Sequence, residues 1–238
     1  MEEAIKRQID ALEGSENADF QELHEDAMRV PAEERYLPSL LNLNIACLTG
    51  NVTLVREMLA DDRVSPQYLW QEKYYWMAYG WPEIVRALLE DERFDPCDND
   101  SYPFFTVCTY GWSDSLRLLL EDGRVHPNIE RDDVPIVEAA AGGHLDAVRL
   151  LLEDGRANPA ARENFCIAVA AERGYEKIVA LLMRDGRVNA SDNHNEAMKE
   201  AIAGKHWGVV RLLTNDRRVM RSLEEGERYI AEKVQKKY

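Results

Sequence analysis

A repeat of about 31 residues is the feature that most limits the folds open to this chain. Six similar segments begin at residues 50, 80, 111, 143, 174 and 205, so successive starts are 30, 31, 32, 31 and 31 residues apart. The segment from Gly111 runs GWSDSLRLLLEDGRVHP, and the one from Gly143 runs GHLDAVRLLLEDGRANP. A fixed period of this length indicates small units that stack on their neighbours in a row.

Each unit has the pattern of two short helices. In the unit at Gly143, apolar residues recur at helical spacing and predict a helix over Leu145–Glu153. Gly155 and Pro159 then end it, and the polar stretch 158–164 suits a turn or hairpin loop. A second helix, Pro135–Ala141, leads into the unit's starting glycine, with its proline in the first turn. The fold class we expect is therefore all-α, an α-solenoid of about six stacked helix–turn–helix units.

The segment VPIVEAAAGGHL, residues 134–145, resembles the ankyrin repeat, whose pattern is TPLHxAAxxGHL. The resemblance covers roughly residues 38–220 and is strongest around Gly143. The units at Gly50, Gly80 and Lys205 lack most of the motif, and the period is shorter than the family's usual 33 residues. The resemblance implies stacked helix pairs that bind another protein in a concave groove, with His144 in a structural position.

The two ends of the array differ from its middle, as the ends of a stack must if they present a polar outer face. Residues 1–37 are highly charged, with apolar residues at helical spacing, and predict two helices. They form either a cap made of a degenerate repeat or a docking segment for another protein. Residues 38–220 form the repeat array, and residues 221–238 a capping helix with a basic tail.

An Asp followed two residues later by an Arg recurs in every unit. The column has two interpretations: a charged ladder that binds a ligand, or ion pairs that fix the loop leaving the second helix of each unit. We favour the structural interpretation, because a feature that every turn of the stack needs does not vary between repeats. The pairs are Asp61/Arg63, Asp91/Arg93, Asp122/Arg124, Asp154/Arg156, Asp185/Arg187 and Asp216/Arg218.

Residues that depart from the repeat are the candidates for function, and two neighbouring units are rich in aromatic residues. Tyr79 and Tyr110 precede the starting glycines, a position that the ankyrin resemblance places in the groove, and Trp81 and Trp112 follow them. Equivalent residues of stacked units lie about 10 Å apart, so the four rings would form one patch. Binding interfaces are enriched in Trp and Tyr, although these rings could instead only pack on one another. The further members of the candidate surface are Trp70 and Tyr75.

The net charge of −15 argues against nucleic acid or an anionic membrane as the main partner, because phosphate binding needs a basic surface. The charge serves either solubility or a preference for basic partners. No apolar run is long enough to span a membrane, and the acidic N-terminus lacks the pattern of a secretory signal. The four cysteines show no CxxC or CxxH spacing, which indicates free thiols in a reducing compartment. We expect a cytoplasmic protein, with delivery into a host cell left open.

Chemistry-bearing motifs are missing from the sequence. It holds no phosphate-binding loop, HExxH, GxSxG or dinucleotide fingerprint, and its five histidines do not pair with cysteines at zinc-ligand spacing. We therefore expect no catalysis, cofactor or metal, and a monomer that acts as an adaptor or scaffold by binding a protein near Gly80 and Gly111. The alternatives are a structural subunit of a larger assembly and, less favoured, an enzyme with an unrecognised site.

Overall fold

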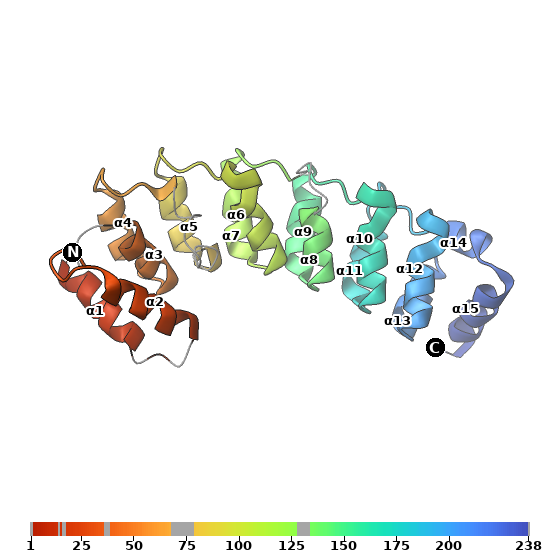
Figure 1. Ribbon diagram of the computed structural model, residues 1–238. Coiled ribbons are helices and arrows are strands. Elements are labelled where there is room, and N and C mark those ends of the chain that lie inside the picture. Colours follow the sequence, from red (N-terminus) through yellow and green to blue (C-terminus); the bar gives the residue numbers. More distant parts are fainter. Residues whose placement is uncertain are drawn as a thin grey trace. The chain divides into compact units, whose positions relative to one another are not determined.

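The computed structural model describes residues 2–13, 15, 18–35, 39–67, 79–127 and 134–237. The described residues form fifteen helices, α1 to α15, and contain no strand (Figure 1). The chain divides into two compact units, one of residues 1–107 and 117–125 and the other of residues 108–116 and 126–238. The all-α repeat solenoid expected from the sequence is confirmed.

The first unit contains α1 (Glu2–Glu13), α2 (Ala18–Arg29), α3 (Leu40–Leu48), α4 (Val52–Leu59) and α5 (Pro82–Leu89). Helices α1 and α2 pack on each other and on α3, and α4 packs on α3 and α5. Ile5, Ile9 and Leu12 of α1 are fully buried, which gives this charged segment a core of its own. Two helices thus precede the array, and their role as a cap stays a prediction.

Two helices cross the boundary between the units. Helix α6 (Asp98–Thr109) ends in the second unit, and α7 (Ser113–Asp122) begins there and ends in the first.

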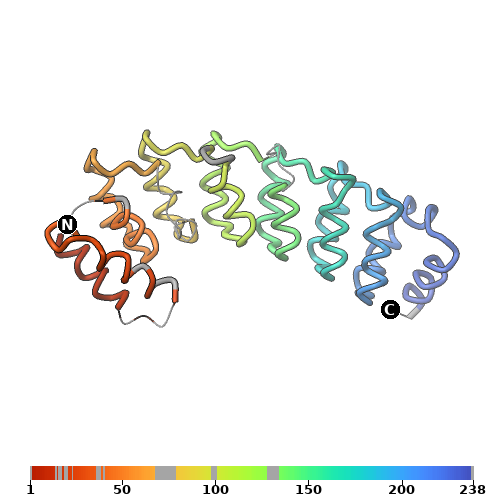
Figure 2. Tube along the Cα trace, in the orientation of Figure 1, coloured from red at the N-terminus to blue at the C-terminus, as the bar shows by residue number. Residues whose placement is uncertain are grey.

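The second unit has two rows of helices. One row holds α8 (Pro135–Ala141), α10 (Ala161–Glu172) and α12 (Asp192–Ala203), and each packs on the next. The other row holds α9 (Leu145–Asp154), α11 (Glu176–Leu182) and α13 (Trp207–Leu213). Figure 2 follows the chain through these helices in sequence order, from green to blue. Helices α14 (Arg217–Ser222) and α15 (Glu225–Lys237) follow, and α15 packs on α12 and α13.

Local signals set the helix ends where the sequence predicted them. Helix α8 spans the predicted residues, with Pro135 in its first turn, where a backbone N–H has no helical partner. Helix α9 is one residue longer than predicted and ends at Gly155, whose φ of 79° is the left-handed conformation that glycine adopts without strain.

The predicted hairpin loop at residues 158–164 is only partly a loop. Arg162, Glu163 and Asn164 have φ between 53° and 62°, so a left-handed turn opens α10. The same turn opens α12, at residues 193–195. Left-handed backbone costs about 1–2 kcal/mol per non-glycine residue, so other contacts must hold these turns in place.

Small residues let α3, α6, α8 and α10 lie close to their neighbouring helices. Ala139 and Ala140 of α8 are fully buried, as are Cys47, Cys108 and Cys166. Burial raises the pKa of the Cys47 thiol to about 12, which keeps it protonated and unreactive. Cys47 and Cys108 are therefore small core groups, as is Ala140 at the same position of its repeat.

Candidate interaction surface

In four repeats the residue after the starting position places its ring over the starting glycine of the preceding repeat. A Cβ added to Gly50 would lie 2.9 Å from the indole of Trp81, and one added to Gly143 would lie 2.8 Å from the ring of Tyr175. His144 covers Gly111 in the same way, and His206 covers Gly174. These four glycines have φ between 70° and 77°, so they need glycine both for backbone conformation and for the ring's approach.

The two histidines of this column also make hydrogen bonds. The His144 Nε2 lies 2.9 Å from the carbonyl oxygen of Thr109, and the His206 Nε2 lies 2.8 Å from that of Glu172. Thr109 and Glu172 are the last residues of α6 and α10, where carbonyls lack a helical partner. The two histidines therefore tie their repeats to the helix end of the repeat before them.

Three of the predicted aromatic residues reach the surface. The side chain of Trp81 is 47% exposed although it covers Gly50, and that of Tyr110 is 49% exposed. The ring of Tyr110 stacks on that of Trp112 with 5.0 Å between centroids and 16° between planes. Stacked rings lose little conformational freedom on binding, which suits them to an interface.

Tyr79 does not belong to this surface. Its side chain is only 2% exposed, so the prediction that it faces a groove is wrong, because the fold buries the residue just before α5. Trp70 and Tyr75 lie outside the described residues. Trp81 belongs to the first compact unit and the Tyr110–Trp112 stack to the second, so the continuity of the patch stays a prediction.

All six Asp–Arg pairs form ion pairs, with N–O distances of 2.6 to 2.8 Å. In the example of Asp91, Oδ1 also accepts the backbone N–H of Arg93, which closes a tight turn. The hydrogen bonds from Arg63 lower the pKa of the Asp61 carboxyl to about 2, and the equivalent bond lowers the pKa of each of the other five.

The arginines of this column also reach into the preceding repeat. Arg93 donates to the carbonyls of Val64 at 3.0 Å and Leu59 at 2.5 Å, and Leu59 is the last residue of α4. Arg124 makes the equivalent bonds to Phe94 and Leu89, the last residue of α5. A cation at this end is favourable because the helix dipole is negative there.

Arginines later in the array also donate to carbonyls of the preceding repeat. Arg187 donates to the carbonyls of Gly155 and Ala157, and Arg218 to that of Val188. The column thus links repeats as well as closing turns.

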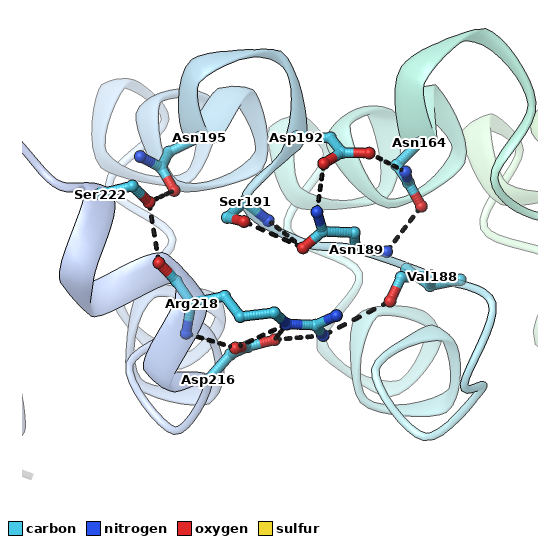
Figure 3. A network of polar contacts seen from close by, with 9 residues as sticks. All are labelled: Asn164, Val188, Asn189, Ser191, Asp192, Asn195, Asp216, Arg218 and Ser222. Atoms are coloured by element: carbon cyan, nitrogen blue, oxygen red, sulfur yellow. Dashed lines mark hydrogen bonds and ion pairs between the residues drawn. The ribbon is translucent and has the colours of Figure 1, made fainter.

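A polar network holds the left-handed turns (Figure 3). Asn164, 5% exposed, donates from Nδ2 to Asp192 at 2.6 Å and accepts the backbone N–H of Asn189 at 2.8 Å through Oδ1. Asn195, 2% exposed, accepts the Ser222 hydroxyl at 2.9 Å. These asparagines were not among the residues predicted from the sequence; their signal is an Asn ten residues before the starting residue in both units.

The described residues lack two features found in other classes of protein. None of their helices has the length and apolar character needed to cross a membrane. They also hold no group of three or more His, Cys, Asp or Glu side chains placed to bind a metal ion.

Comparison with known proteins places the repeats in a family. The model of ankyrin repeats, in three copies, matches residues 74–163, a stretch that includes the ring column at Trp81 and His144. No curated protein matches the chain. Ankyrin repeats are in general modules for protein–protein interaction. The match and the repeated helix pairs together support an ankyrin-repeat family for this stretch of the chain.

Proposed function

We propose that this chain is an adaptor or scaffold that binds a partner protein through exposed aromatic residues at the turns between paired helices. The observation that carries the proposal is the Tyr110–Trp112 stack, because Tyr110 leaves half of its side chain exposed while its ring is held parallel to a second ring. Trp81 offers a second rigid ring, fixed against Gly50 and about half exposed.

The stacking of the repeats does not need the exposed part of either side chain. Tyr175, His144 and His206 fill the column of Trp81 in other repeats, so a smaller ring suffices to cover the glycine. The column of Tyr110 holds Gly142, Arg173 and Gly204 in later repeats, so no ring is needed there. Large exposed rings that stacking does not need are the residue type that dominates binding energy at interfaces.

The net charge of the chain and its expected location add two features to the proposal. The net charge of −15 favours a partner with a basic surface, because opposite charges speed the encounter of two proteins. We place the encounter in the cytoplasm and expect a monomeric chain.

The test removes the rings and follows binding by the full-length chain. The variants are Tyr110→Ala, which truncates a half-exposed residue, and the double variant Trp81→Ala/Tyr110→Ala. The control is Tyr229→Ala on α15, because Tyr229 is 63% exposed and is not part of the ring column. Each protein is used to capture partners from extract of its native cell, and the affinity of a captured partner is then measured by calorimetry.

We expect Tyr110→Ala to weaken binding by about 2 kcal/mol, near thirty-fold in Kd, as for a central aromatic residue of an interface. The double variant should bind more weakly still, and Tyr229→Ala should bind like the parent. Affinity within two-fold of the parent for a correctly folded double variant would disprove the proposal.

A further inference from the structure

The last repeat of the array contains a pocket whose lining departs from the repeat pattern. The pocket has a volume of about 450 Å³ and is open to solvent on one side. It lies within the second compact unit, at the turn between α12 and α13 and beside the start of α11. Its lining residues are Glu176, Lys205, His206, Trp207, Gly208 and Arg211.

Three changes from the pattern, within four residues, line this one pocket. Lys205 occupies the starting position where the other five units have glycine, and it keeps the left-handed conformation with φ of 59°. Gly208 occupies a position held elsewhere by larger residues, namely Thr53, Glu83, Asp114, Asp146 and Lys177. Trp207 stands where the other units have Val52, Pro82, Ser113, Leu145 and Glu176.

Gly208 both opens the pocket and leaves Arg211 without the acidic partner that two earlier repeats provide. In earlier repeats the acidic residue at this position pairs with an arginine three residues later: Asp146 with Arg149 at 2.6 Å and Glu83 with Arg86 at 3.5 Å. Arg211 is the equivalent arginine, and Gly208 offers it no carboxylate. Any side chain at Gly208 would overlap the carboxylate of Glu176, which lies against the glycine.

The charges around the pocket are available to a ligand. Lys205, Arg211 and Glu176 are all exposed, and within the described part of the chain none of the three has an ion pair. Two cations face one carboxylate, so the pocket is locally positive in a chain whose net charge is −15. One wall is fixed, because His206 covers Gly174 and bonds to the carbonyl of Glu172.

We propose that this pocket binds an acidic segment of the partner protein. Carboxylate side chains of the segment pair with Lys205 and Arg211, and the indole of Trp207 packs against its apolar atoms. Glu176 accepts from backbone N–H groups, which a peptide has and a simple anion lacks. The inference rests on the proposed function, to which it adds a second contact that sets the register of the bound partner.

The test uses the full-length chain and two synthetic peptides. One is the acetylated and amidated tetrapeptide Phe-Glu-Asp-Glu, and the other is its neutral counterpart Phe-Gln-Asn-Gln. Binding is followed by NMR through the indole N–H of Trp207 and the backbone N–H groups of residues 205–211. Inorganic phosphate is titrated in parallel.

The variants place residues of the repeat pattern at positions 205 and 208, and the Glu176 carboxylate that Gly208→Asp would overlap is the flexible end of an exposed side chain, so both variants should fold. Gly208→Asp supplies Arg211 with the acidic residue that Asp146 gives Arg149, and it fills the pocket. Lys205→Gly removes one cation and a left-handed non-glycine residue. The control is Lys177→Ala, which removes a cation from the adjacent helix outside the pocket lining.

We expect the acidic peptide to bind saturably, at least ten-fold more tightly than the neutral one, with affinity that falls as salt is added. Gly208→Asp should abolish binding, Lys205→Gly should weaken it several-fold, and Lys177→Ala should leave it within two-fold. Equal binding of both peptides, unchanged binding to Gly208→Asp, or equal binding of phosphate would overturn the proposal. The Trp81→Ala/Tyr110→Ala variant should still bind the peptide, so failure of the pocket and failure of the aromatic surface are told apart.

Discussion

Replacing Arg93 by alanine tests whether the Asp–Arg column joins repeats or only closes its own turn. Arg93 is one-third exposed and donates to two carbonyls of the preceding repeat as well as to Asp91, which is 12% exposed. Arg63 makes the same pair with Asp61, but its side chain is 69% exposed and its bonds to described residues all go to Asp61. The two arginines therefore differ mainly in the contact between repeats.

The size of the effect follows from the bonds that are lost. A hydrogen bond with a charged partner contributes about 1.5–3 kcal/mol when buried, and partial exposure of the guanidinium reduces this. Two such bonds, together with the unpaired carboxylate left at Asp91, predict a loss of about 2–3 kcal/mol for Arg93→Ala. Arg63→Ala should change stability much less, because water replaces most of what that arginine contacts.

The assay is equilibrium unfolding in urea followed by circular dichroism, with both variants and the parent at one salt concentration. The slope of the free energy of unfolding against urea must match between proteins for the midpoints to be compared. Arg93→Lys is a further variant, and it should recover only part of the loss because an ammonium cannot reproduce the planar fork of donors. Equal destabilisation by Arg93→Ala and Arg63→Ala would refute the role of this column in joining repeats.

Three other predictions follow from the same contacts. The pKa of Asp185 is lowered by its bond to Arg187, so the ionised carboxylate stabilises the fold fully above the unfolded pKa near 4, and this stabilisation is lost as pH falls through the lower folded pKa. Asp185→Asn should therefore flatten the fall of Tm below about pH 4, and a fall parallel to that of the parent would contradict this. Gly143→Ala should lower the free energy of unfolding in urea by about 2–4 kcal/mol, because it strains the backbone and displaces the ring of Tyr175. Gly155 has a similar φ and open space around it, so Gly155→Ala should lower it by only about 1–2 kcal/mol, and equal losses would disprove the ring contact. Asn195→Ala should lose about 1–3 kcal/mol and speed hydrogen exchange in α14, and unchanged exchange there would show that the bond to Ser222 contributes nothing.

The sequence was sufficient for those parts of the fold that depend on local signals and on the period. Pro135 and the left-handed Gly155 mark helix ends by their own backbone chemistry, so the bounds of α8 and α9 could be predicted to within a residue. The left-handed turns at 162–164 and 193–195 could not, because they are strained locally and depend on bonds to residues about 25 to 28 positions away.

The candidate surface was harder to predict, because exposure depends on neighbours in space. Tyr79 and Tyr110 occupy the same column, yet one is 2% and the other 49% exposed. Likewise Trp81 and Gly50 lie in different repeats, so nothing in the sequence alone shows that the indole covers the glycine. Aligning the repeats identifies which residues are unusual, and only the packing shows which of those the stack already uses.

A functional residue in such an array must therefore meet two conditions: it departs from its column, and stacking does not fully occupy it. Tyr79 meets only the first, because it is buried. Trp81 meets both in part, since one face of the indole covers Gly50 and about half of the side chain remains exposed. Lys205 meets both in full, because it departs from a column of glycines and stays exposed and unpaired among the described residues. At the starting glycines, a ring from the following repeat lies where a side chain would be. A lysine at this position would overlap such a ring, so Lys205 provides a cation but cannot be covered by another repeat of this kind.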